Sequence, residues 1–202
     1  MKKLAYLFSL LLAANFIFIG CNSDDDLVVE EGVVINGIRW ATRNVDTPGT
    51  FAATPGSAGM FYQWNRNTAY ATTGDIDNWN TSAASGTEWA RGNDPCPSGW
   101  RVPTRTEWQS LLNAASSRWV ERYGVYGRLF GSAPNQIFLP AVGARGFGIA
   151  GGRGIYGFYW SSTQHNRENA IYMGFSDGNT YTGGLAWVER EFAMSIRCVA
   201  TR

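Results

Sequence analysis

The chain has 202 residues, of which 16% are charged, 14% are aromatic and 24 are glycines, and its formal net charge is +1. A charge so close to balance gives no electrostatic reason to expect binding to nucleic acid or to an anionic surface. Glycine at this frequency without a three-residue period excludes collagen, and the aromatic content excludes a disordered chain. We therefore expect a folded, loop-rich domain.

The first 20 residues have the pattern of an export signal. Two lysines precede an apolar stretch from Leu4 to Ile19, which is too short for a comfortable membrane span. Gly20-Cys21 follows, and this junction resembles the lipobox of bacterial lipoproteins, where the signal is cut before a cysteine that is acylated. We interpret residues 1–20 as a lipoprotein signal peptide and Cys21 as the lipidated residue. A buried N-terminal helix is the alternative.

Residues 21–31 are interpreted as a lipidated acidic tether. Asp24, Asp25 and Asp26 repel one another and favour an extended, solvated segment. An acidic triplet just after the lipidated cysteine resembles the export signal of surface lipoproteins in the Bacteroidetes. We therefore expect a lipid anchor in the outer membrane, with the protein facing the cell exterior. A hydrated spacer without a sorting role is the alternative.

The remaining residues, 32–202, have the size of one globular domain. The domain is predicted to open with a hairpin, because β-prone residues flank Asn36-Gly37, the best type I′ turn dipeptide. The stretch from Thr47 to Pro95 is too long for a single structureless loop. We expect short strands and turns there, held by four aromatic side chains: Phe61, Trp64, Trp79 and Trp89.

One helix is clearly indicated after Pro103. Thr104 and Glu107 have the spacing of a capping box, in which each residue bonds the backbone amide of the other. An apolar stripe follows at i, i+3, i+4 and i+7, formed by Trp108, Leu111, Leu112 and Ala115.

Beyond this helix the pattern is mainly one of strands and turns. A second helical turn is predicted through Trp119–Tyr123, ended by Gly124, and residues 143–157 form a glycine-dense loop. Apolar and β-branched runs predict strands at Ile137–Pro140, Tyr159–Thr163, Ala170–Phe175, Thr180–Thr182 and Ala193–Ala200. The predicted class is α+β: a glycine-rich antiparallel sheet with one well-defined helix and long loops.

Two cysteines remain once Cys21 is assigned to the lipid. Cys96 and Cys198 form an even pair in an exported protein, where disulfides persist. The residues alone leave two possibilities, a disulfide bridge or two buried thiols.

Several segments resemble, in order, those of one known family. They are Cys96–Thr104 followed by Glu107-Trp108, Leu139–Ala141 followed by Gly143 and Arg145, Tyr159–Thr163, and Ser195–Val199. Together they resemble the Fibrobacter succinogenes major paralogous domain, and the resemblance covers Val33 to Ala200. It implies a C-type-lectin-like fold, in which a cysteine at the start of a helix pairs with one in the last strand. A Cys96–Cys198 disulfide follows from it, but no established activity does.

Catalytic chemistry has little support in the sequence. Gly152–Gly157 fits G-x-G-x-x-G, but a strand-like run follows where a dinucleotide site needs a helix. His165 is the only histidine, and no G-x-S-x-G elbow or second imidazole accompanies it, so we expect it in a surface loop. No carboxylate pair for glycosidase chemistry is visible. Formylglycine-generating enzymes share the lectin-like fold but need reactive cysteines, which a bridge would occupy. We predict that the protein is not an enzyme.

Metal and cofactor binding are not predicted either. Sugar-binding C-type lectins hold calcium with Glu-Pro-Asn or Gln-Pro-Asp and Trp-Asn-Asp, and none of these motifs is present. Asp75–Asn78 and Asn93-Asp94 are the weak alternatives, because calcium prefers clustered oxygen ligands.

The residues most suited to ligand binding are aromatic and arginine side chains in predicted loops. They are Trp79, Trp89, Trp187, Arg145 and Arg153. The predicted function is therefore a non-catalytic, lipid-anchored binding or adhesion module for a glycan or a surface protein. The alternative is a structural or assembly component of a cell-surface complex with no small ligand.

Overall fold

The structure is a computed structural model that describes residues 30–113, 116–177 and 183–201. The predicted signal peptide, Cys21, the acidic triplet and the predicted strand Thr180–Thr182 lie outside the described residues. Glu30, predicted as part of the tether, is bound to the domain. Its carboxylate accepts hydrogen bonds from the Thr42 amide at 2.8 Å and from Arg43 Nε at 2.9 Å.

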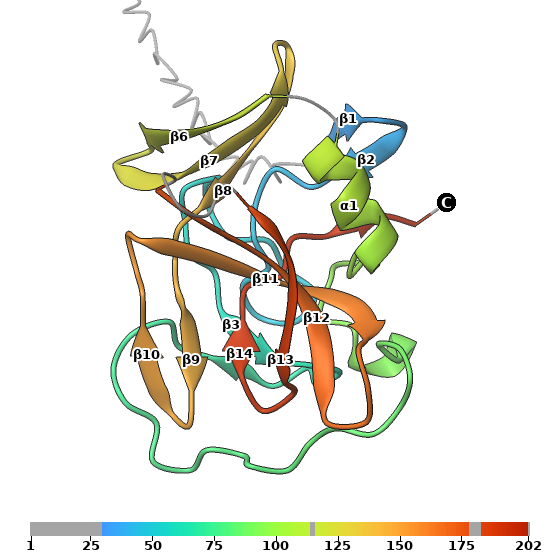
Figure 1. Ribbon diagram of the computed structural model, residues 1–202, viewed down its shortest axis with the longest axis vertical. Helices are drawn as coiled ribbons and strands as arrows, with labels where there is room; N and C mark the ends of the chain where they lie inside the picture. The colour runs from blue at the N-terminus through green and yellow to red at the C-terminus, as the bar shows by residue number, and fades with distance from the viewer. Residues whose placement is uncertain (1–29, 114–115, 178–182, 202) are drawn as a thin grey trace, which may run out of the picture.

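The described chain is mostly antiparallel β-structure with one short α-helix (Figure 1). The elements in chain order are β1 (Val33–Ile35), β2 (Ile38–Trp40), β3 (Phe61–Gln63), β4 (Ala69–Tyr70), the 3₁₀ turn η1 (Arg91–Asn93), β5 (Trp100–Arg101), α1 (Arg105–Asn113), β6 (Ser117–Arg122), β7 (Val125–Ser132), β8 (Asn135–Pro140), β9 (Ala144–Gly146), β10 (Ile149–Gly151), β11 (Tyr156–Gln164), β12 (Asn169–Ser176), β13 (Gly184–Glu189), β14 (Ala193–Met194) and β15 (Val199–Ala200). No helix among these elements is both long and apolar enough to span a membrane.

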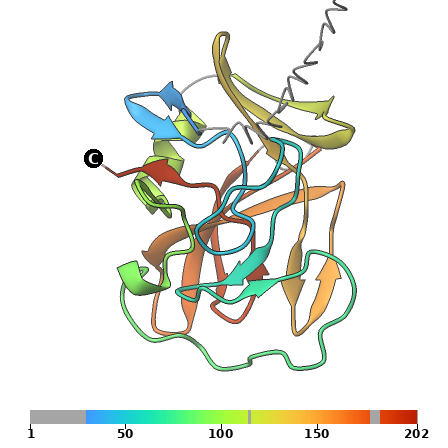
Figure 2. The ribbon, with the colours of Figure 1, turned by 180° about the vertical axis from the view of Figure 1, so that it is seen from behind.

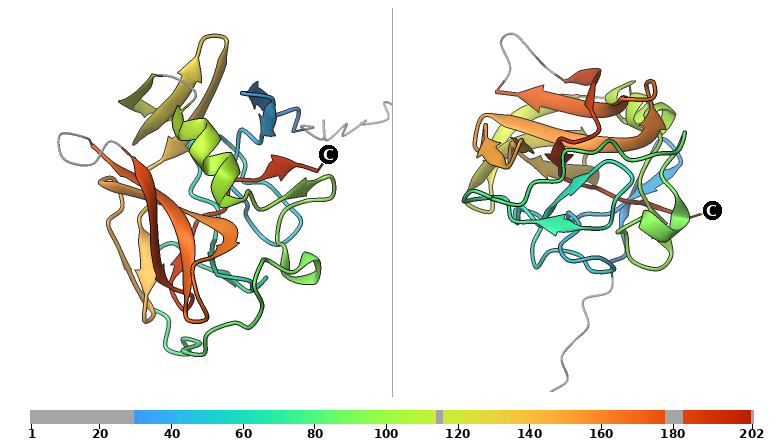
Figure 3. Two further views of the ribbon diagram at one scale, coloured as in Figure 1. Left: turned by 45° about the vertical axis from the view of Figure 1, so that its right-hand side comes forward. Right: turned by 90° about the horizontal axis from the view of Figure 1, so that it is seen from below.

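The strands form small sheets with the orders β1-β2-β15-β5, β10-β9-β14-β3-β4, β11-β12-β13 and β6-β7-β8. The first of them unites the two ends of the domain, because Val199 pairs with Trp40 on one side and with Arg101 on the other. Figure 2 shows this from behind, with the last strand lying close to the first hairpin. The helix α1 packs against the β11-β12-β13 sheet (Figure 3).

The predicted opening hairpin is confirmed. Val33–Ile35 pairs antiparallel with Ile38–Trp40. The two turn residues have positive φ angles, 49° for Asn36 and 74° for Gly37, as a type I′ turn requires.

The predicted helix and its capping box are also confirmed. The Glu107 amide donates to Thr104 Oγ1 at 3.2 Å, and the Thr104 amide donates to Glu107 Oε2 at 2.8 Å. Trp108 and Leu111 are buried in the core, as the apolar stripe predicted. The cap therefore fixes the start of α1, and the stripe fixes the face that packs inward.

The second predicted helical turn is wrong. Residues Ser117–Arg122 form strand β6, which pairs antiparallel with β7 along its whole length. Gly124, expected to stop a helix, is instead the second residue of the hairpin turn, with φ of 73°. Cross-strand pairing with β7 outweighs the weak local helix tendency, as commonly happens for short segments.

The predicted strand Ala193–Ala200 is divided between two sheets. β14 belongs to the sheet of β3 and β9, whereas β15 belongs to the sheet of β2 and β5. The backbone between them bonds to neighbouring segments instead of one ladder: Ile196 O accepts from the Val45 amide at 3.0 Å, and Cys198 O accepts from the Ala41 amide at 2.9 Å. A strand-like sequence here crosses from one sheet to the next.

Large aromatic side chains fill the core. Five of the nine tryptophans are buried: Trp40, Trp64, Trp89, Trp108 and Trp160. Three indole N–H groups bond across the core: Trp108 Nε1 to Trp160 O at 3.1 Å, Trp160 Nε1 to Tyr62 O at 2.8 Å and Trp64 Nε1 to Ser161 O at 2.9 Å. The rings therefore join elements that are distant in sequence, both by packing and by hydrogen bonds.

The glycine-dense loop at residues 143–157 contains the hairpin β9–β10. Gly143 has a φ of 75°, and a Cβ there would lie 2.0 Å from Gly151 O, so no other residue fits. Gly152 and Gly154 also have positive φ angles, and strand β11 begins at Tyr156. This is the turn-then-strand arrangement predicted from the sequence, and it differs from a dinucleotide loop, which leads into a helix.

Candidate functional site

A long loop between β4 and β5 covers one end of the molecule. Residues 71–99 contain no strand, and η1 is their one helical turn. In Figure 1 the loop runs along the bottom, opposite the β6-β7-β8 sheet, and the turns of β9–β10 and β11–β12 lie beside it. Loops positioned by a rigid scaffold commonly carry binding residues, so we consider this end the candidate functional surface.

Arg145 on β9 holds the first part of the long loop. Its side chain is fully buried, and Nη2 donates to Ala71 O at 2.7 Å and to Thr73 O at 3.0 Å. Nη1 donates to Gly148 O in the β9–β10 turn. Burial lowers the pKa of Arg145, although the nearby charge of Asp75 acts in the opposite direction. The guanidinium of Arg145, predicted as a ligand contact, thus faces inward and positions backbone.

Arg190, which follows β13, holds the middle of the loop in the same way. Its side chain is 2% exposed. Its two Nη atoms donate to four oxygens: Ala84 O at 2.7 Å, Gly86 O at 2.9 Å, Gln164 Oε1 at 2.9 Å and Asn166 O at 2.6 Å. One guanidinium therefore joins the long loop to the β11–β12 turn.

Asn65 forms a third anchor, where the chain leaves β3. It is buried and has a φ of 54°, a conformation that asparagine tolerates better than most residues. Its Nδ2 donates to Ser85 O at 2.8 Å, and its Oδ1 accepts from the Ala90 amide at 2.7 Å. Side-chain hydrogen bonds thus replace the missing sheet ladder in this part of the chain.

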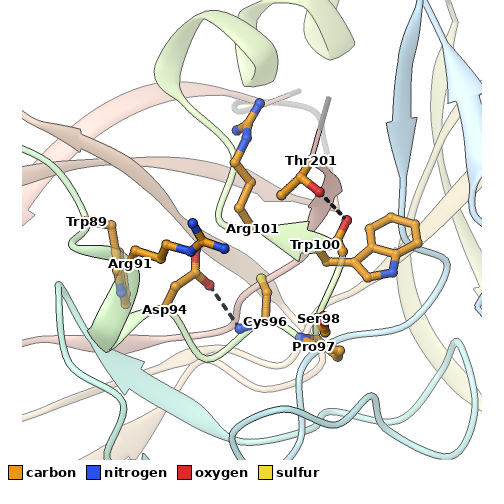
Figure 4. Close-up of a pocket in the computed structure, with 10 residues that line it drawn as sticks. Trp89, Arg91, Asp94, Cys96, Pro97, Ser98, Trp100, Arg101 and Thr201 are labelled. Carbon is orange, nitrogen blue, oxygen red and sulfur yellow. Dashed lines mark hydrogen bonds between the residues drawn. The ribbon is translucent and has the colours of Figure 1, made fainter.

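Two hollows of similar size flank the long loop. One has a volume of about 620 Å³ and lies between residues 83–87 and the β11–β12 turn, with Gln164, Arg167 and Glu168 on its wall and Arg190 at its base. The other has a volume of about 590 Å³ and lies beside the disulfide (Figure 4). Both fall in the size range of small-molecule sites.

Backbone amides and a salt bridge hold the charged groups of the second hollow. The Asp94 carboxylate accepts from the amides of Cys96 at 2.9 Å and Val102 at 3.0 Å. Burial raises the pKa of Asp94, although these two amides and Arg101 act in the opposite direction. Arg101 in turn pairs with Glu107 at 2.5 Å. These groups therefore shape the wall of the hollow, while Arg91 on η1 is exposed at its edge.

The disulfide between Cys96 and Cys198 is present, as predicted. It joins residues 102 positions apart, with a Cα–Cα distance of 6.1 Å. It connects the segment that leads into α1 with the residue just before β15. The bridge therefore supports the wall of the second hollow as well as the end of the domain.

Three of the five predicted ligand residues lie around the start of the long loop. Trp79 is half-buried, with its ring 4.8 Å from that of Tyr70. Arg153 is exposed and donates to Thr72 Oγ1 at 3.3 Å. Both lie near the segment held by Arg145, so the structure brings these three residues into one region.

The other two predicted ligand residues have different surroundings: Trp89 lines the hollow beside the disulfide, and Trp187 stacks on His165. Trp89 is only 7% exposed, and its Nε1 donates to Asn93 O at 2.9 Å. Trp187 was predicted in a loop but lies on strand β13, because it pairs with Ile171 of β12, and it is 55% exposed. The imidazole of His165 stacks parallel to the Trp187 indole, with ring centres 4.9 Å apart and planes 4° apart. His165 is exposed in the β11–β12 turn, as predicted.

Three observations bear on metal and catalytic chemistry in the described residues. Within the described ranges, no three His, Cys, Asp or Glu side chains gather in a way that could hold a metal ion. Cys96 and Cys198 are oxidised, so neither can act as a thiolate nucleophile. His165 contacts an indole, with no nucleophile–base pair formed around it in the interactions described.

Sequence patterns did not predict the loop-holding role of Arg190, the anchor at Asn65 or the stacking of His165 on Trp187. These contacts join residues that are far apart in the chain, up to 106 positions for Arg190 and Ala84. One feature of the sequence could have indicated such a role for Arg190: apart from Lys2 and Lys3, the cationic side chains are all arginines. Arginine suits sites where one side chain must donate to several fixed acceptors.

Comparison with known families gives a match that differs from the resemblance described above. The family model for the Lcl C-terminal domain matches residues 57–200. The Fibrobacter succinogenes major paralogous domain is therefore not the family of this chain, although the short motifs around Cys96 and Cys198 resemble it. No curated protein and no solved structure matches the chain. The C-type-lectin-like fold inferred from that resemblance stays a prediction.

Proposed function

The chain belongs to the Lcl C-terminal domain family, and from this we propose that it is a non-catalytic binding module tethered by lipid at the cell surface. Domains of this family occur typically in surface and secreted bacterial proteins, and no catalytic activity is known for them. The Cys96–Cys198 disulfide indicates a location outside the cytoplasm. The ligand in this proposal is a glycan or a surface protein.

The observation that carries the binding role is how the long loop is held. Arg145, Arg190 and Asn65 fix it through side-chain hydrogen bonds to backbone groups. A loop held in one conformation loses less conformational entropy on binding than a mobile loop, which favours recognition. The hollows beside it supply a concave surface of mixed apolar and polar groups next to that loop.

Binding is tested directly with the full chain purified in detergent. The protein is applied to an array of bacterial, plant and host glycans and is cross-linked on intact cells to identify neighbouring proteins. The proposal expects saturable binding to at least one glycan class or one surface protein. Failure of both assays with folded protein would reject the binding role.

The anchor in this proposal is the lipid on Cys21. Cys21→Ser is expected to release the protein from membranes or to leave it unprocessed, and to abolish incorporation of labelled palmitate. A variant that still fractionates with membranes and incorporates label would contradict the anchor. It would leave the binding proposal standing.

Outward orientation depends in this proposal on the acidic triplet. Replacing Asp24, Asp25 and Asp26 with alanine should retain the lipid but reduce cleavage by protease added to intact cells. Replacing them with glutamate, which keeps the charge, is the matched control. Equal cleavage of the alanine variant and the parent protein would show that the triplet is only a spacer.

An assembly role without a small ligand is the second candidate, and one observation favours it. Two hairpin turns present exposed aromatic side chains at positive φ: Tyr123 is 58% exposed with φ of 53°, and Phe147 is 67% exposed with φ of 49°. Bulky residues rarely adopt this conformation, and such strain concentrates at functional sites. Exposed apolar tips suit contact with another protein.

A further inference from the structure

One tryptophan of this protein, Trp187, is much more exposed than the others. Of the nine, five are buried and three are half-buried, whereas Trp187 is 55% exposed. It lies on β13, opposite Ile171 in the register with β12. An indole exposes a large apolar area together with one N–H donor, and in this fold every other indole is buried or half-buried.

The exposed indole is held in place by its neighbour. The His165 imidazole lies parallel to it, with ring centres 4.9 Å apart and planes 4° apart. The two residues come from different segments, the β11–β12 turn and strand β13, so the stack requires the sheet to be formed. Because the imidazole backs the indole, the ring is pre-organised and does not have to be ordered when a ligand arrives.

A small hollow of about 160 Å³ lies at this ring. Ile171, Leu185 and Ala186 form its apolar part, and His165 and Arg105 add polar groups. The hollow therefore combines one flat apolar surface with a few hydrogen-bonding groups. This combination matches a molecule that has an apolar face and a polar edge.

We propose that Trp187, backed by His165, is the platform of a carbohydrate subsite that takes one pyranose ring. The C–H groups of one sugar face would pack on the indole face that His165 leaves free, because that π face is electron-rich, and the hydroxyl edge would meet Arg105. A pyranose has this division into an apolar face and a hydroxyl edge, whereas a flat hydrocarbon would offer no acceptor to Arg105. The inference rests on the proposed binding role and names the chemistry of one of its ligands.

A site for a single ring is expected to bind weakly. The contact is small and largely exposed, so a dissociation constant on the order of 1 mM is expected for a short oligosaccharide. Repeated copies of the protein on one surface would raise the effective affinity for a polymeric glycan. The test must therefore detect millimolar binding.

The test uses the full chain in detergent, labelled with 5-fluorotryptophan and observed by ¹⁹F NMR. Trp187→Phe identifies the Trp187 resonance by its disappearance. Neutral and acidic oligosaccharides are then titrated separately, each at low and high salt. The proposal expects the Trp187 resonance to shift progressively with at least one of them, with small or no shifts for the buried tryptophans.

Variants show whether the indole is the platform. Trp187→Ala should weaken sugar binding about tenfold or more, while Trp187→Tyr should retain most of it, because a ring is kept. His165→Ala should weaken binding less than Trp187→Ala, and His165→Phe should restore it. Tyr126→Ala, which removes a ring of similar exposure elsewhere, is the control and should leave binding unchanged. Circular dichroism of each variant verifies that it is folded.

Two outcomes would overturn the subsite. Sugar binding that survives Trp187→Ala would place the glycan elsewhere and leave the binding role intact. A Trp187 resonance unmoved by every sugar, in a protein that captures a surface protein by cross-linking, would show a binding module without this subsite.

Discussion

The guanidinium of Arg190 lies over the indole of Trp64, with its carbon 4.2 Å from the ring centre. The same guanidinium donates to backbone carbonyls of the long loop on its other sides. Trp64 is fully buried and its own Nε1 donates to Ser161 O at 2.9 Å. The loop is therefore connected through one arginine to a ring that is itself fixed in the core.

The first prediction concerns this connection. Arg190→Met should lower the free energy of unfolding by about 2–4 kcal/mol, because it removes the cation–π contact and leaves buried carbonyls such as Ala84 O without a donor. Urea denaturation measures the loss, and hydrogen exchange should show weaker protection in residues 83–87. Arg167→Met is the control, since Arg167 is exposed on the same hollow, and its effect should stay within about 0.5 kcal/mol. Equal effects of the two substitutions would refute the anchoring role of Arg190.

The second prediction concerns the disulfide. Replacing both Cys96 and Cys198 with serine should lower the free energy of unfolding by about 2–5 kcal/mol, because the unfolded chain regains the freedom that a long closed loop removes. Thermal and urea unfolding measure this loss. Peptide mapping of the parent protein without reduction should recover one cross-linked pair of peptides. Two alkylatable thiols in folded, exported protein would contradict the bridge.

The third prediction concerns the helix cap and its pH dependence. Burial alone would raise the pKa of Glu107, but hydrogen bonds from Arg101 and from the Thr104 amide outweigh it and hold that pKa below its ordinary value. A carboxyl with a lowered folded pKa stabilises the fold above its unfolded pKa, and this contribution is lost as the pH falls through the folded value. Acidification should therefore remove the contribution of Glu107 to stability.

The variant Glu107→Gln tests this linkage. At pH 7 it should be less stable than the parent by about 1–2 kcal/mol, since the charged bonds to Arg101 are lost. The difference should shrink at acidic pH, once Glu107 is protonated in the parent. Glu121→Gln is the control, because Glu121 is exposed on β6. A difference that is the same at pH 7 and pH 3 would argue against the charged cap.

The fourth prediction concerns the strained aromatic turn of β9–β10. Phe147→Asn should leave the stability unchanged or raise it by up to about 1 kcal/mol, because asparagine tolerates positive φ better than phenylalanine. One ring contact is lost, since the Phe147 ring lies 5.8 Å from that of Phe192. Denaturant unfolding measures the change. A loss larger than about 1 kcal/mol would mean that the ring supports the fold and is not kept mainly for contact with a partner.

Local signals in the sequence predicted the local parts of this fold. Asn36-Gly37 fixed the first hairpin, and the Thr104–Glu107 spacing fixed the start of α1, because both depend on residues a few positions apart. Trp119–Tyr123 was misassigned, since its conformation is decided by pairing with β7. Local patterns of this kind therefore predict structure well where the contacts that determine it join residues close together in the sequence.

The candidate site could be predicted only in part. Trp79 and Arg153 lie in loops near Arg145, as predicted, but Arg145 is on strand β9, and the burial of Arg145 and Trp89 depends on packing that no local pattern encodes. Trp187 was one of three tryptophans predicted to bind a ligand, and its stacking on His165 depends on how the β11-β12-β13 sheet is assembled. Composition therefore indicated the residue types, and tertiary structure determined which of them face outward.

The position of the disulfide has a consequence for the protein after damage. A single backbone cut between Cys96 and Cys198 leaves two fragments that remain covalently joined, so both stay with whatever holds the N-terminal part. A cut in residues 71–95 has a different result, because the two fragments are then joined only by non-covalent contacts such as the pairing of β15 with β2. The long loop before Cys96 is thus the segment where one cleavage could shed the rest of the domain.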